Sequence, residues 1–403
     1  MRETTRVDDL AIFGGPPAFA EPLHVGRPNV GDRARLMDRL GEMLDRGWLT
    51  NDGPFVRAFE WRVAELLGVR HCVAMSSGTV ALEIAIRALG MAGEVIVPSF
   101  TFVATAHALQ WQEITPVFCD IEPATHTLDP RRVEPMISDR TTGIIGVHLW
   151  GRPCDVHALR EIADRRNLRL LFDASHAFGC SYRGQMLGRF GDAEVLSFHA
   201  TKFINTFEGG AVLTGDDELA EKMRLMRNFG FAGYDRVIYL GTNGKMNEAA
   251  AAMGLTSLES FEEFVETNRR NYRRYQQEIE SIPGLTLMPV DPAERHNYQY
   301  VVVEADPAQT RLSRDQLVDI LWAENVRARR YFFPGCHRME PYRSLYPDAG
   351  LTLPVTERVA DRVLLLPTGT AIGEREVTTI GSLLKTAIEN ADRIAEHFAA
   401  RQG

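Results

Sequence analysis

The sequence predicts an α/β fold in two parts, a large domain with a mostly parallel sheet covered by helices and a smaller C-terminal α+β domain. Short, continuously apolar segments alternate with helical ones between residues 55 and 213, as in parallel sheets covered on both faces. After Pro283 and Gly284 the pattern becomes a mixture of strands and helices. We expect an N-terminal arm over 1–30, the large domain over 31–255 and the small domain over 256–403.

Individual elements follow from the period of the apolar residues and from turn residues between them. The turn Asn51-Asp52-Gly53-Pro54, for example, precedes an amphipathic helix. The segment 247–281 contains no proline and predicts one long helix, continuous or interrupted, that bridges the domains. The other expected helices cover 33–45, 55–67, 80–89, 101–110, 155–165, 314–324, 355–361 and 374–399. The expected strands cover 72–75, 94–98, 116–120, 142–149, 168–173, 195–198, 210–213 and 298–303.

Composition narrows the possible partners and location of the protein. The 403 residues are 45% hydrophobic and 25% charged, which is typical of globular proteins. A net charge of -9 argues against nucleic acid as the main partner, because binding to phosphate backbones needs clustered basic residues. Five scattered cysteines without a Cys-x-x-Cys pair indicate a reducing compartment, so we expect a cytoplasmic protein. The N-terminus lacks the apolar core of a signal peptide, and no apolar run is long enough to span a membrane.

Lys202 belongs to the most informative motif, Ser-Phe-His-Ala-Thr-Lys at 197–202. A Glu-Gly-Gly triplet follows it at 208–210, and Asp-Ala-Ser-His precedes it at 173–176. A lysine amine attacks carbonyl groups when its site lowers its pKa. The motifs around Lys202 predict that it binds pyridoxal phosphate as a Schiff base. Without them, the alternative interpretation is a surface lysine at a strand end.

Asp173 ends an apolar strand, and ligands of parallel sheets bind at the carboxyl ends of strands. Its carboxylate could pair with the pyridine nitrogen of the cofactor and keep it protonated, so that the ring accepts electrons. The alternative role is the N-cap of the next segment. His176 could bind the phenolic oxygen of the cofactor or orient Asp173, or it could be a structural histidine.

The sequence Ser-Ser-Gly-Thr at 76–79 lies between a predicted strand and a predicted helix. Small residues there let backbone N–H groups reach a phosphate, and the helix dipole favours an anion. The hydroxyls of Thr79 and Ser197 could add hydrogen bonds. A simple turn with a helix cap is the alternative. Phe102 could stack on the pyridine ring, with core packing as its alternative.

The segment 241–248 offers an amide, Asn243, and a cation, Lys245, just before a long helix. It is not a phosphate-binding Walker A loop, because Tyr239 and Met246 occupy the positions where that motif needs Gly and Ser or Thr. An ordinary polar loop is the alternative interpretation.

Together these motifs resemble the sugar aminotransferases of the DegT/DnrJ/EryC1/StrS family, which have the fold-type I architecture of pyridoxal-phosphate enzymes. The resemblance spans nearly the whole chain. It is carried by Gly-Trp-Leu-Thr-Asn-Asp-Gly-Pro at 47–54, Ser-Ser-Gly-Thr at 76–79, Pro-Ser-Phe-Thr-Phe at 98–102, Asp-Ala-Ser-His at 173–176, Ser-Phe-His-Ala-Thr-Lys at 197–202, Glu-Gly-Gly at 208–210, Arg-Asn-Phe-Gly at 227–230 and Leu-Leu-Leu-Pro at 364–367.

The resemblance implies a role for each site residue. Lys202 would form the Schiff base and later move the proton, Asp173 would pair with the ring nitrogen, and His176 would lie near the ring oxygen. The remaining cofactor contacts would be Gly78, Thr79 and Ser197 at the phosphate and Phe102 on the ring.

The loop with Asn243 and Lys245 would reach the phosphate bound by the neighbouring subunit, which implies a homodimer. The family loop reads Asn-Tyr-Arg-Met-Ser-Glu, whereas this chain has Asn-Gly-Lys-Met-Asn-Glu. Lysine keeps the positive charge of arginine and loses its forked geometry.

By this resemblance the reaction moves an amino group from an amino acid, typically glutamate, to a nucleotide-linked keto-sugar. Such reactions make deoxyaminosugars for antibiotics or polysaccharides. The segment 331–342 resembles the branch that acts at C4 of dTDP-4-keto-6-deoxyhexoses, and a C3 aminotransferase is the alternative. Candidate substrate-binding residues are Arg329, Arg330, Tyr331, Phe333, His337 and Arg338, although the arginines could instead be solvated.

Two other functions are weighed against amino transfer. Family members that act as sugar 3-dehydratases carry histidine at the position of Lys202, so lysine favours amino transfer. A regulatory protein that binds the cofactor without catalysis is the other alternative, but no helix-turn-helix or basic region supports DNA binding and the set of site residues is intact.

Overall fold

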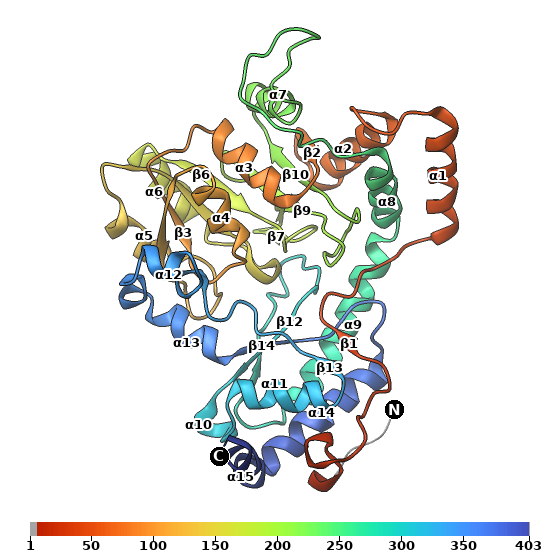
Figure 1. Ribbon diagram of the computed structural model, residues 1–403, viewed down its shortest axis with the longest axis vertical. Helices are drawn as coiled ribbons and strands as arrows, with labels where there is room; N and C mark the ends of the chain where they lie inside the picture. Colours follow the sequence, from red (N-terminus) through yellow and green to blue (C-terminus); the bar gives the residue numbers. More distant parts are fainter. Residues whose placement is uncertain (1–5, 403) are drawn as a thin grey trace.

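A computed structural model describes residues 6–402, and it places the N-terminal region against the C-terminal part of the chain (Figure 1). Of the expected arm over 1–30, the first five residues lie outside the described residues. The rest contains two 3-10 turns, Val7–Asp9 and Ala11–Phe13, and the two-residue strand β1, Leu23–His24. This strand pairs in parallel with β13, Val326–Arg327, and thereby ties the arm to the C-terminal part.

A seven-stranded sheet in the order β2-β10-β9-β6-β5-β3-β4 forms the larger part of the molecule. Six of its strands run parallel to one another, and β10 is antiparallel to both of its neighbours. This confirms the predicted fold class. The strands are β2 (His71–Met75), β3 (Glu94–Pro98), β4 (Thr115–Cys119), β5 (Thr141–Val147), β6 (Arg169–Asp173), β9 (Ala193–Ser197) and β10 (Gly210–Thr214). Their side chains are almost all buried, because helices cover both faces of the sheet.

Helices of this part connect the strands and cover the sheet in the way that the apolar periodicity predicts. Helix α3 packs on β9 and β10, whereas α2 packs on β2 and on α8. The helices are α1 (Arg33–Arg46), α2 (Pro54–Leu67), α3 (Gly78–Ala88), α4 (Ala104–Gln110), α5 (Pro130–Val133), α6 (Val156–Arg166), α7 (Asp217–Met226) and α8 (Glu248–Glu259). A small hairpin, β7 (Ser181–Tyr182) with β8 (Gln185–Met186), lies beside them.

A three-stranded antiparallel sheet, β11-β12-β14, forms the centre of the C-terminal part. It has its own core, which the arm residues Leu10 and Phe19 complete. The strands are β11 (Leu285–Leu287), β12 (Val301–Ala305) and β14 (Val363–Leu366). The helices are α9 (Phe261–Ile279), α10 (Pro307–Thr310), α11 (Arg314–Ala323), α12 (Tyr342–Leu345), α13 (Pro354–Arg362), α14 (Glu374–Glu389) and α15 (Ala391–Gln402). Among the described residues, no helix has the length and apolar character to cross a membrane.

Four predicted elements differ from the structure by an internal break or by three residues at one end, whereas the other bounds agree within about two residues. The long helix breaks at Ser260, so that α8 packs on α1 and α2 while α9 packs on α14. The final helix breaks at Asn390. The helix predicted from residue 101 begins at Ala104, and the strand predicted over 298–303 begins at Val301.

The carboxyl ends of three parallel strands place polar side chains at one edge of the large sheet. Asp173 is the last residue of β6, Ser197 is the last residue of β9, and Ser77 follows β2 and caps α3. Because such an edge is where ligands of open α/β sheets bind, it is the expected place for a site.

Candidate active site

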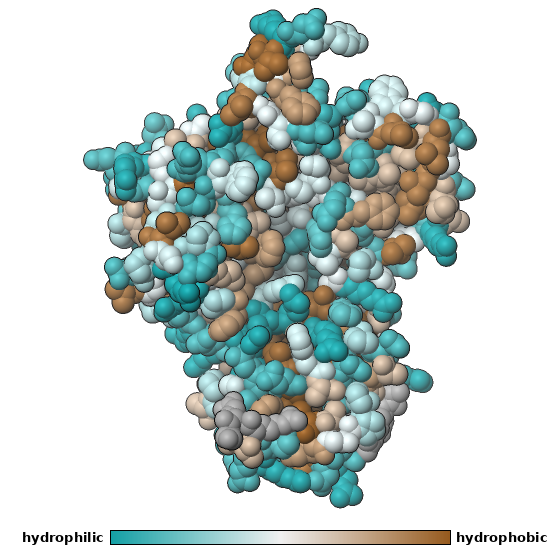
Figure 2. Space-filling view, viewed as in Figure 1, coloured by the Kyte–Doolittle hydropathy of each residue, from teal (hydrophilic) through white to brown (hydrophobic). Residues whose placement is uncertain are grey.

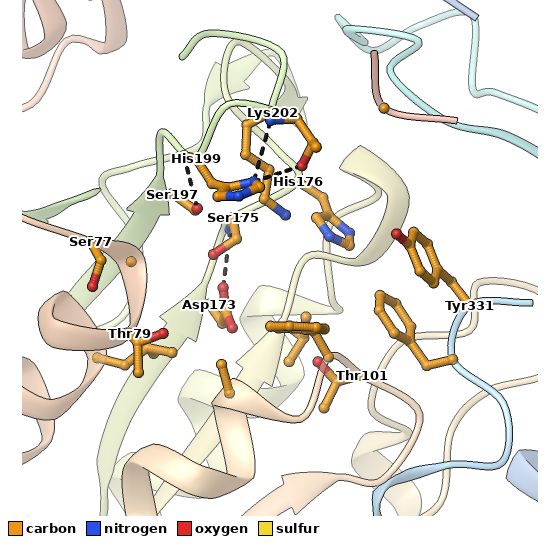
Figure 3. Close-up of a pocket in the computed structure, with 18 of the residues that line it drawn as sticks. Ser77, Thr79, Thr101, Asp173, Ser175, His176, Ser197, His199, Lys202 and Tyr331 are labelled. Atoms are coloured by element: carbon orange, nitrogen blue, oxygen red, sulfur yellow. Dashed lines mark hydrogen bonds between the residues drawn. The ribbon is translucent and has the colours of Figure 1, made fainter. Parts of the chain in front are cut away.

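A cavity of about 300 Å³ lies at this edge, between the large sheet and a loop of the C-terminal part (Figure 3). It brings together predicted site residues that are up to about 250 positions apart in the chain. The predicted residues that line it are Gly78, Thr79, Phe102, Asp173, His176, Ser197, Lys202 and Tyr331.

Lys202 lies in a loop after β9, where its backbone N–H donates to the carbonyl of His199 over 2.8 Å. Its side chain extends into the cavity toward His176 (Figure 3). Desolvation by the surrounding protein lowers the pKa of the Lys202 amine to about 8, and the Asp173 carboxylate partly opposes this shift. Near physiological pH this amine is neutral in a much larger fraction of molecules than an ordinary lysine is, and the neutral form is a nucleophile and proton acceptor.

Asp173 lies on the opposite side of the cavity from Lys202 and is 5% exposed. Its two carboxylate oxygens accept different hydrogen bonds. The backbone N–H of Ser175 donates to Oδ1 over 3.1 Å, and the hydroxyl of Thr105 donates to Oδ2 over 2.9 Å. Asp173 thus also holds the following turn. In the described part of the chain no helix lies between β6 and β7, so Asp173 is not the helix N-cap of the alternative interpretation, and its carboxylate lines the cavity.

His176 lies in one wall of the cavity, in a cluster of aromatic rings. Its ring is stacked with those of Trp150 and Phe332, at centroid distances of 5.8 and 5.9 Å. The backbone N–H of Trp150 donates to His176 Nδ1 over 3.4 Å, which leaves Nε2 as the protonated nitrogen. Burial, reinforced by the charge of Lys202, keeps the pKa of His176 well below its ordinary value, so the ring is neutral.

The corner formed by Ser77, Gly78 and Ser197 is crowded at its backbone. A Cβ on Gly78 would lie 2.9 Å from Ser197 Cβ, and a Cβ on Gly210 would lie 2.5 Å from the carbonyl oxygen of Ser77. Glycine is therefore required at both positions. The close approach leaves the first turn of α3, with its N–H groups, directed at the cavity beside the hydroxyls of Thr79 and Ser197.

A second cavity of about 360 Å³ adjoins the first and shares Thr101, Phe102, Tyr331 and Phe332 with it. Aromatic rings and two arginines line this cavity. The Arg329 guanidinium lies 5.0 Å from the Tyr331 ring centroid, and that of Arg330 lies 5.5 Å from the Phe333 centroid. Phe102 is 56% exposed at the junction of the two cavities.

Two of the predicted substrate-binding residues do not line either cavity. The His337 side chain is 1% exposed, with Nδ1 2.7 Å from Ser99 Oγ and Nε2 2.7 Å from Glu357 Oε1. Arg338 binds the same Glu357 carboxylate. Both side chains thus hold this loop against α13 through Glu357.

Asn243 and Lys245 also lie outside the first cavity of their own chain. Lys245 Nζ donates to Asn228 Oδ1 over 2.9 Å and lies 4.9 Å from the Phe229 ring centroid. Asn243 forms a β-bridge with Asn228. The carbonyl of Gly244 accepts from the N–H of Ser76, so this loop lies against the turn at 76–79.

The structure adds residues that the sequence analysis missed. Thr101 and Thr105 form a hydroxyl pair behind Asp173, while Tyr300 and Phe332 complete the aromatic wall. Thr105 stands between two alanines in the predicted helix, and a hydroxyl that is buried in such a place needs a hydrogen-bond partner, so the sequence held a signal for it. The position of Phe332 depends on packing against residues that are distant in the sequence, so no pattern in the neighbouring residues predicts it.

Comparisons with known proteins agree with this geometry. Residues 31–385 match the DegT/DnrJ/EryC1/StrS aminotransferase family. The chain is 35% identical to the dTDP-4-amino-4,6-dideoxy-D-glucose transaminase of Escherichia coli over 89% of this chain and 97% of the relative. It is 38% identical to the transaminase of the same name from Shigella dysenteriae over 86% and 94%. A crystal structure of DesI in the presence of its TDP-sugar product superposes with a TM-score of 0.93 at 51% identity, covering 98% of this chain and all of that one.

Proposed function

The chain belongs to the DegT/DnrJ/EryC1/StrS aminotransferase family, whose members depend on pyridoxal phosphate, and we propose the reaction that it performs within this family. It transfers the amino group of an amino acid, L-glutamate in the first instance, to C4 of a dTDP-4-keto-6-deoxyhexose. The observation that carries this proposal is the cavity in which the amine of Lys202, the carboxylate of Asp173 and the turn at 77–79 converge.

The residues of the cavity fit pyridoxal phosphate on chemical grounds. An aldehyde needs an amine with a lowered pKa, a pyridine nitrogen needs an anion, and a phosphate needs N–H and O–H donors beside tightly packed glycines. The cavity supplies Lys202, Asp173 and the crowded corner at Gly78, in that order. When bound, the cofactor supplies an electron sink for the carbanion of the substrate.

Each residue then has a proposed task. Lys202 holds the cofactor and moves a proton at the reacting carbon of the substrate, a contribution of about 10²–10⁴-fold for general acid–base catalysis. Asp173 fixes the ring nitrogen, and neutral His176 offers its Nε2–H to the ring oxygen. The phosphate contacts come from Gly78, Thr79 and Ser197, and Phe102 covers the ring.

The second cavity supports a nucleotide sugar as the amino acceptor. It shares Tyr331 with the first cavity and is lined by Arg330, which is half exposed and pairs with Asp315 over 3.0 Å. Together with the exposed aromatic surface, this guanidinium suits a diphosphate joined to a base. The names of two relatives place the amino group at C4 of their sugar, and this supports the same carbon here. A C3 aminotransferase acting on a dTDP-3-keto-6-deoxyhexose is the alternative.

A panel of keto-sugars tests this assignment. Protein loaded with pyridoxal phosphate is mixed with glutamate and with 3-keto or 4-keto nucleotide sugars carrying dTDP, UDP or GDP. We expect the highest kcat/KM with the dTDP-linked 4-keto-6-deoxyhexose. Preference for a 3-keto-sugar would select the alternative, and no change of the cofactor absorption with any amino donor would reject an aminotransferase.

The pH dependence of cofactor binding should report the shifted pKa of Lys202. Only the neutral amine attacks an aldehyde, so the rate of cofactor attachment to cofactor-free protein should rise with pH and level off above about 8. The side-chain amine of free Nα-acetyl-lysine has the ordinary pKa of about 10.4, so its rate of attachment should continue to rise past that pH. Stopped-flow absorbance measures both rates, and a protein profile that follows free lysine would contradict the environment described for Lys202.

Arg330 and Arg338 form a matched pair for testing the second cavity. Arg330→Ala should raise the KM for the nucleotide sugar about five- to tenfold and leave kcat almost unchanged, because a half-exposed charge contributes modestly to ground-state binding. Arg338→Ala should leave both constants near wild type, since Arg338 does not line the cavities. Equal effects in the two variants would contradict the assignment of the second cavity.

We also propose a homodimer, supported by a projecting hairpin with exposed apolar side chains. Residues 229–240 extend beyond α7 at the top of the molecule, and brown side chains gather there (Figures 1 and 2). The bridge between Phe231 and Val237 orders this hairpin. Its exposed large residues are Phe229, Phe231, Tyr234, Val237, Ile238, Tyr239 and Leu240. An ordered apolar surface of this kind is typical of an interface, and it adjoins the loop of Asn243 and Lys245 that we assign to the partner's site.

Leu240→Asp should therefore dissociate the dimer and reduce activity. Leu240 is 70% exposed within the hairpin, and Leu351, which is 82% exposed on another surface, provides the matched control. Light scattering should show a monomer for Leu240→Asp and a dimer for Leu351→Asp and for the wild type. A wild-type monomer with full activity would overturn the proposed assembly.

A cytoplasmic location completes the proposal. All five cysteines are buried free thiols, and burial raises the pKa of Cys119, Cys180 and Cys336 to about 12. These thiols are unreactive and unpaired, which suits a reducing compartment.

A further inference from the structure

Behind Asp173 a chain of two buried hydroxyls leads from the cavity to the carboxylate. Thr105, in the first turn of α4, is fully buried, and its Oγ1 lies 2.9 Å from Asp173 Oδ2. Thr101 is 1% exposed, lines the cavity and has its Oγ1 3.1 Å from that of Thr105. Figure 3 shows Thr101 and Asp173 facing the same space.

The chemistry of the groups fixes the direction of these hydrogen bonds. An ionised carboxylate only accepts, so the single hydroxyl hydrogen of Thr105 points at Asp173. The Thr105 oxygen can then only accept from Thr101, whose hydroxyl is the donor in that contact. Hydrogen bonds aligned in this way polarise one another, and each strengthens the next toward the negative charge.

The carboxylate depends on these donors because the structure gives it few others. Among the described residues, no arginine, lysine or histidine forms an ion pair with Asp173 within 4 Å. Its two hydrogen bonds come from Ser175 N–H and Thr105 O–H, one on each oxygen. A buried carboxylate whose only side-chain donor is removed loses a hydrogen bond to its charged form and is free to tilt.

We propose that Thr105 is a positioning residue for amino transfer, which holds Asp173 ionised and in one orientation so that the proton shared with the cofactor stays on the ring nitrogen. This inference rests on the proposed function, because Asp173 must face that nitrogen. Thr101 supports Thr105 and has no direct bond to the carboxylate.

Three substitutions separate the hydroxyl from the packing at this position. Thr105→Val and Thr105→Ala both remove the hydroxyl, and they differ in volume so that one of them can fold if the other does not. Thr105→Ser keeps the hydroxyl and is the matched control. The proton is located by the ¹⁵N chemical shift of pyridoxal phosphate labelled at the ring nitrogen and bound to each protein, with Asp173→Asn as the reference for loss of the anion.

In Thr105→Val and Thr105→Ala we expect the ring-nitrogen shift to move toward the Asp173→Asn value. We also expect kcat to fall about ten- to a hundredfold, the usual value of a hydrogen bond to a charged group, with KM for the keto-sugar within twofold of wild type. Thr105→Ser should match the wild type in the ring-nitrogen shift and in kcat. If a substitution acts only on the position of the proton, the thermal midpoint of the cofactor-free variant should lie within a few degrees of the wild-type midpoint.

The outcomes distinguish this inference from the proposed function. A wild-type ring-nitrogen shift in loaded Thr105→Val or Thr105→Ala overturns the role of Thr105 and leaves the function intact. A shift that moves equally in Thr105→Ser overturns it too, because packing would then be the cause. A wild-type protein that binds no pyridoxal phosphate overturns the proposed function and this inference together.

Discussion

Replacing Lys202 with alanine is expected to abolish amino transfer, with kcat reduced at least about 10³-fold. Lys202 is proposed both to hold the cofactor and to move the proton, and the proton transfer alone contributes about 10²–10⁴-fold. The loss should not come from unfolding. Because burial lowers the pKa of the Lys202 amine to about 8, folding disfavours its charged form, and removal of this amine should leave the thermal midpoint unchanged or raise it.

Two measurements check the role of Lys202. Turnover is measured with glutamate and the keto-sugar, and the attachment point is found by borohydride reduction followed by peptide mass spectrometry. The modified peptide of the wild type should contain Lys202, and the variant should have none. Lys222→Ala is the control, because Lys222 donates to the carbonyl of Ala88 outside the cavity. Turnover of Lys202→Ala within tenfold of the wild type would refute the assignment.

Asp173→Asn is expected to have the second-largest effect. It removes a buried negative charge opposite Lys202 while keeping the shape of the side chain. The charge pair that it removes is the proposed one between Asp173 and the ring nitrogen of the cofactor. Loss of one member of a buried, hydrogen-bonded charge pair costs about 2–5 kcal/mol, or roughly 30- to 5,000-fold in rate. Steady-state kcat measures the effect.

Asp216→Asn is the control for Asp173→Asn. Asp216 caps α7, where asparagine is an equally good cap, so its kcat should equal that of the wild type. If Asp173→Asn kept kcat within threefold of the wild type, the carboxylate would have no electronic role and would serve only to hold the turn at Ser175.

The large sheet could be predicted from sequence because its strands are nearly continuous apolar runs between turn residues. The misplaced bounds have local causes. At residue 298 the backbone is left-handed, and the N–H of Tyr298 bonds to the His296 side chain, so the strand begins only at Val301. Thr101 and Phe102 form the turn before α4, in which the N–H of Thr105 donates to the carbonyl of Phe102.

The site residues likewise fall into two groups, those that local motifs predict and those whose role depends on partners distant in the sequence. Lys202, Asp173 and the turn at 77–79 lie in short motifs at strand ends, so their convergence was predictable from the topology of a parallel sheet. His337 shows the opposite case. The basic side chain of His337 predicted an anion site. In the fold, its Nε2 contacts the carboxylate of Glu357, which lies 20 positions further along the chain. Charge patterns in sequence do not indicate which charges are already paired in the fold.

Transfer of ¹⁵N from labelled L-glutamate to the sugar tests the central claim most directly. The loaded protein is incubated with ¹⁵N-glutamate and dTDP-4-keto-6-deoxyglucose, and the product is examined by mass spectrometry and NMR. We predict a ¹⁵N label bound to C4 of the dTDP-sugar, together with 2-oxoglutarate, and no label with Lys202→Ala. A sugar that carries no ¹⁵N, or carries it at C3, would contradict the account.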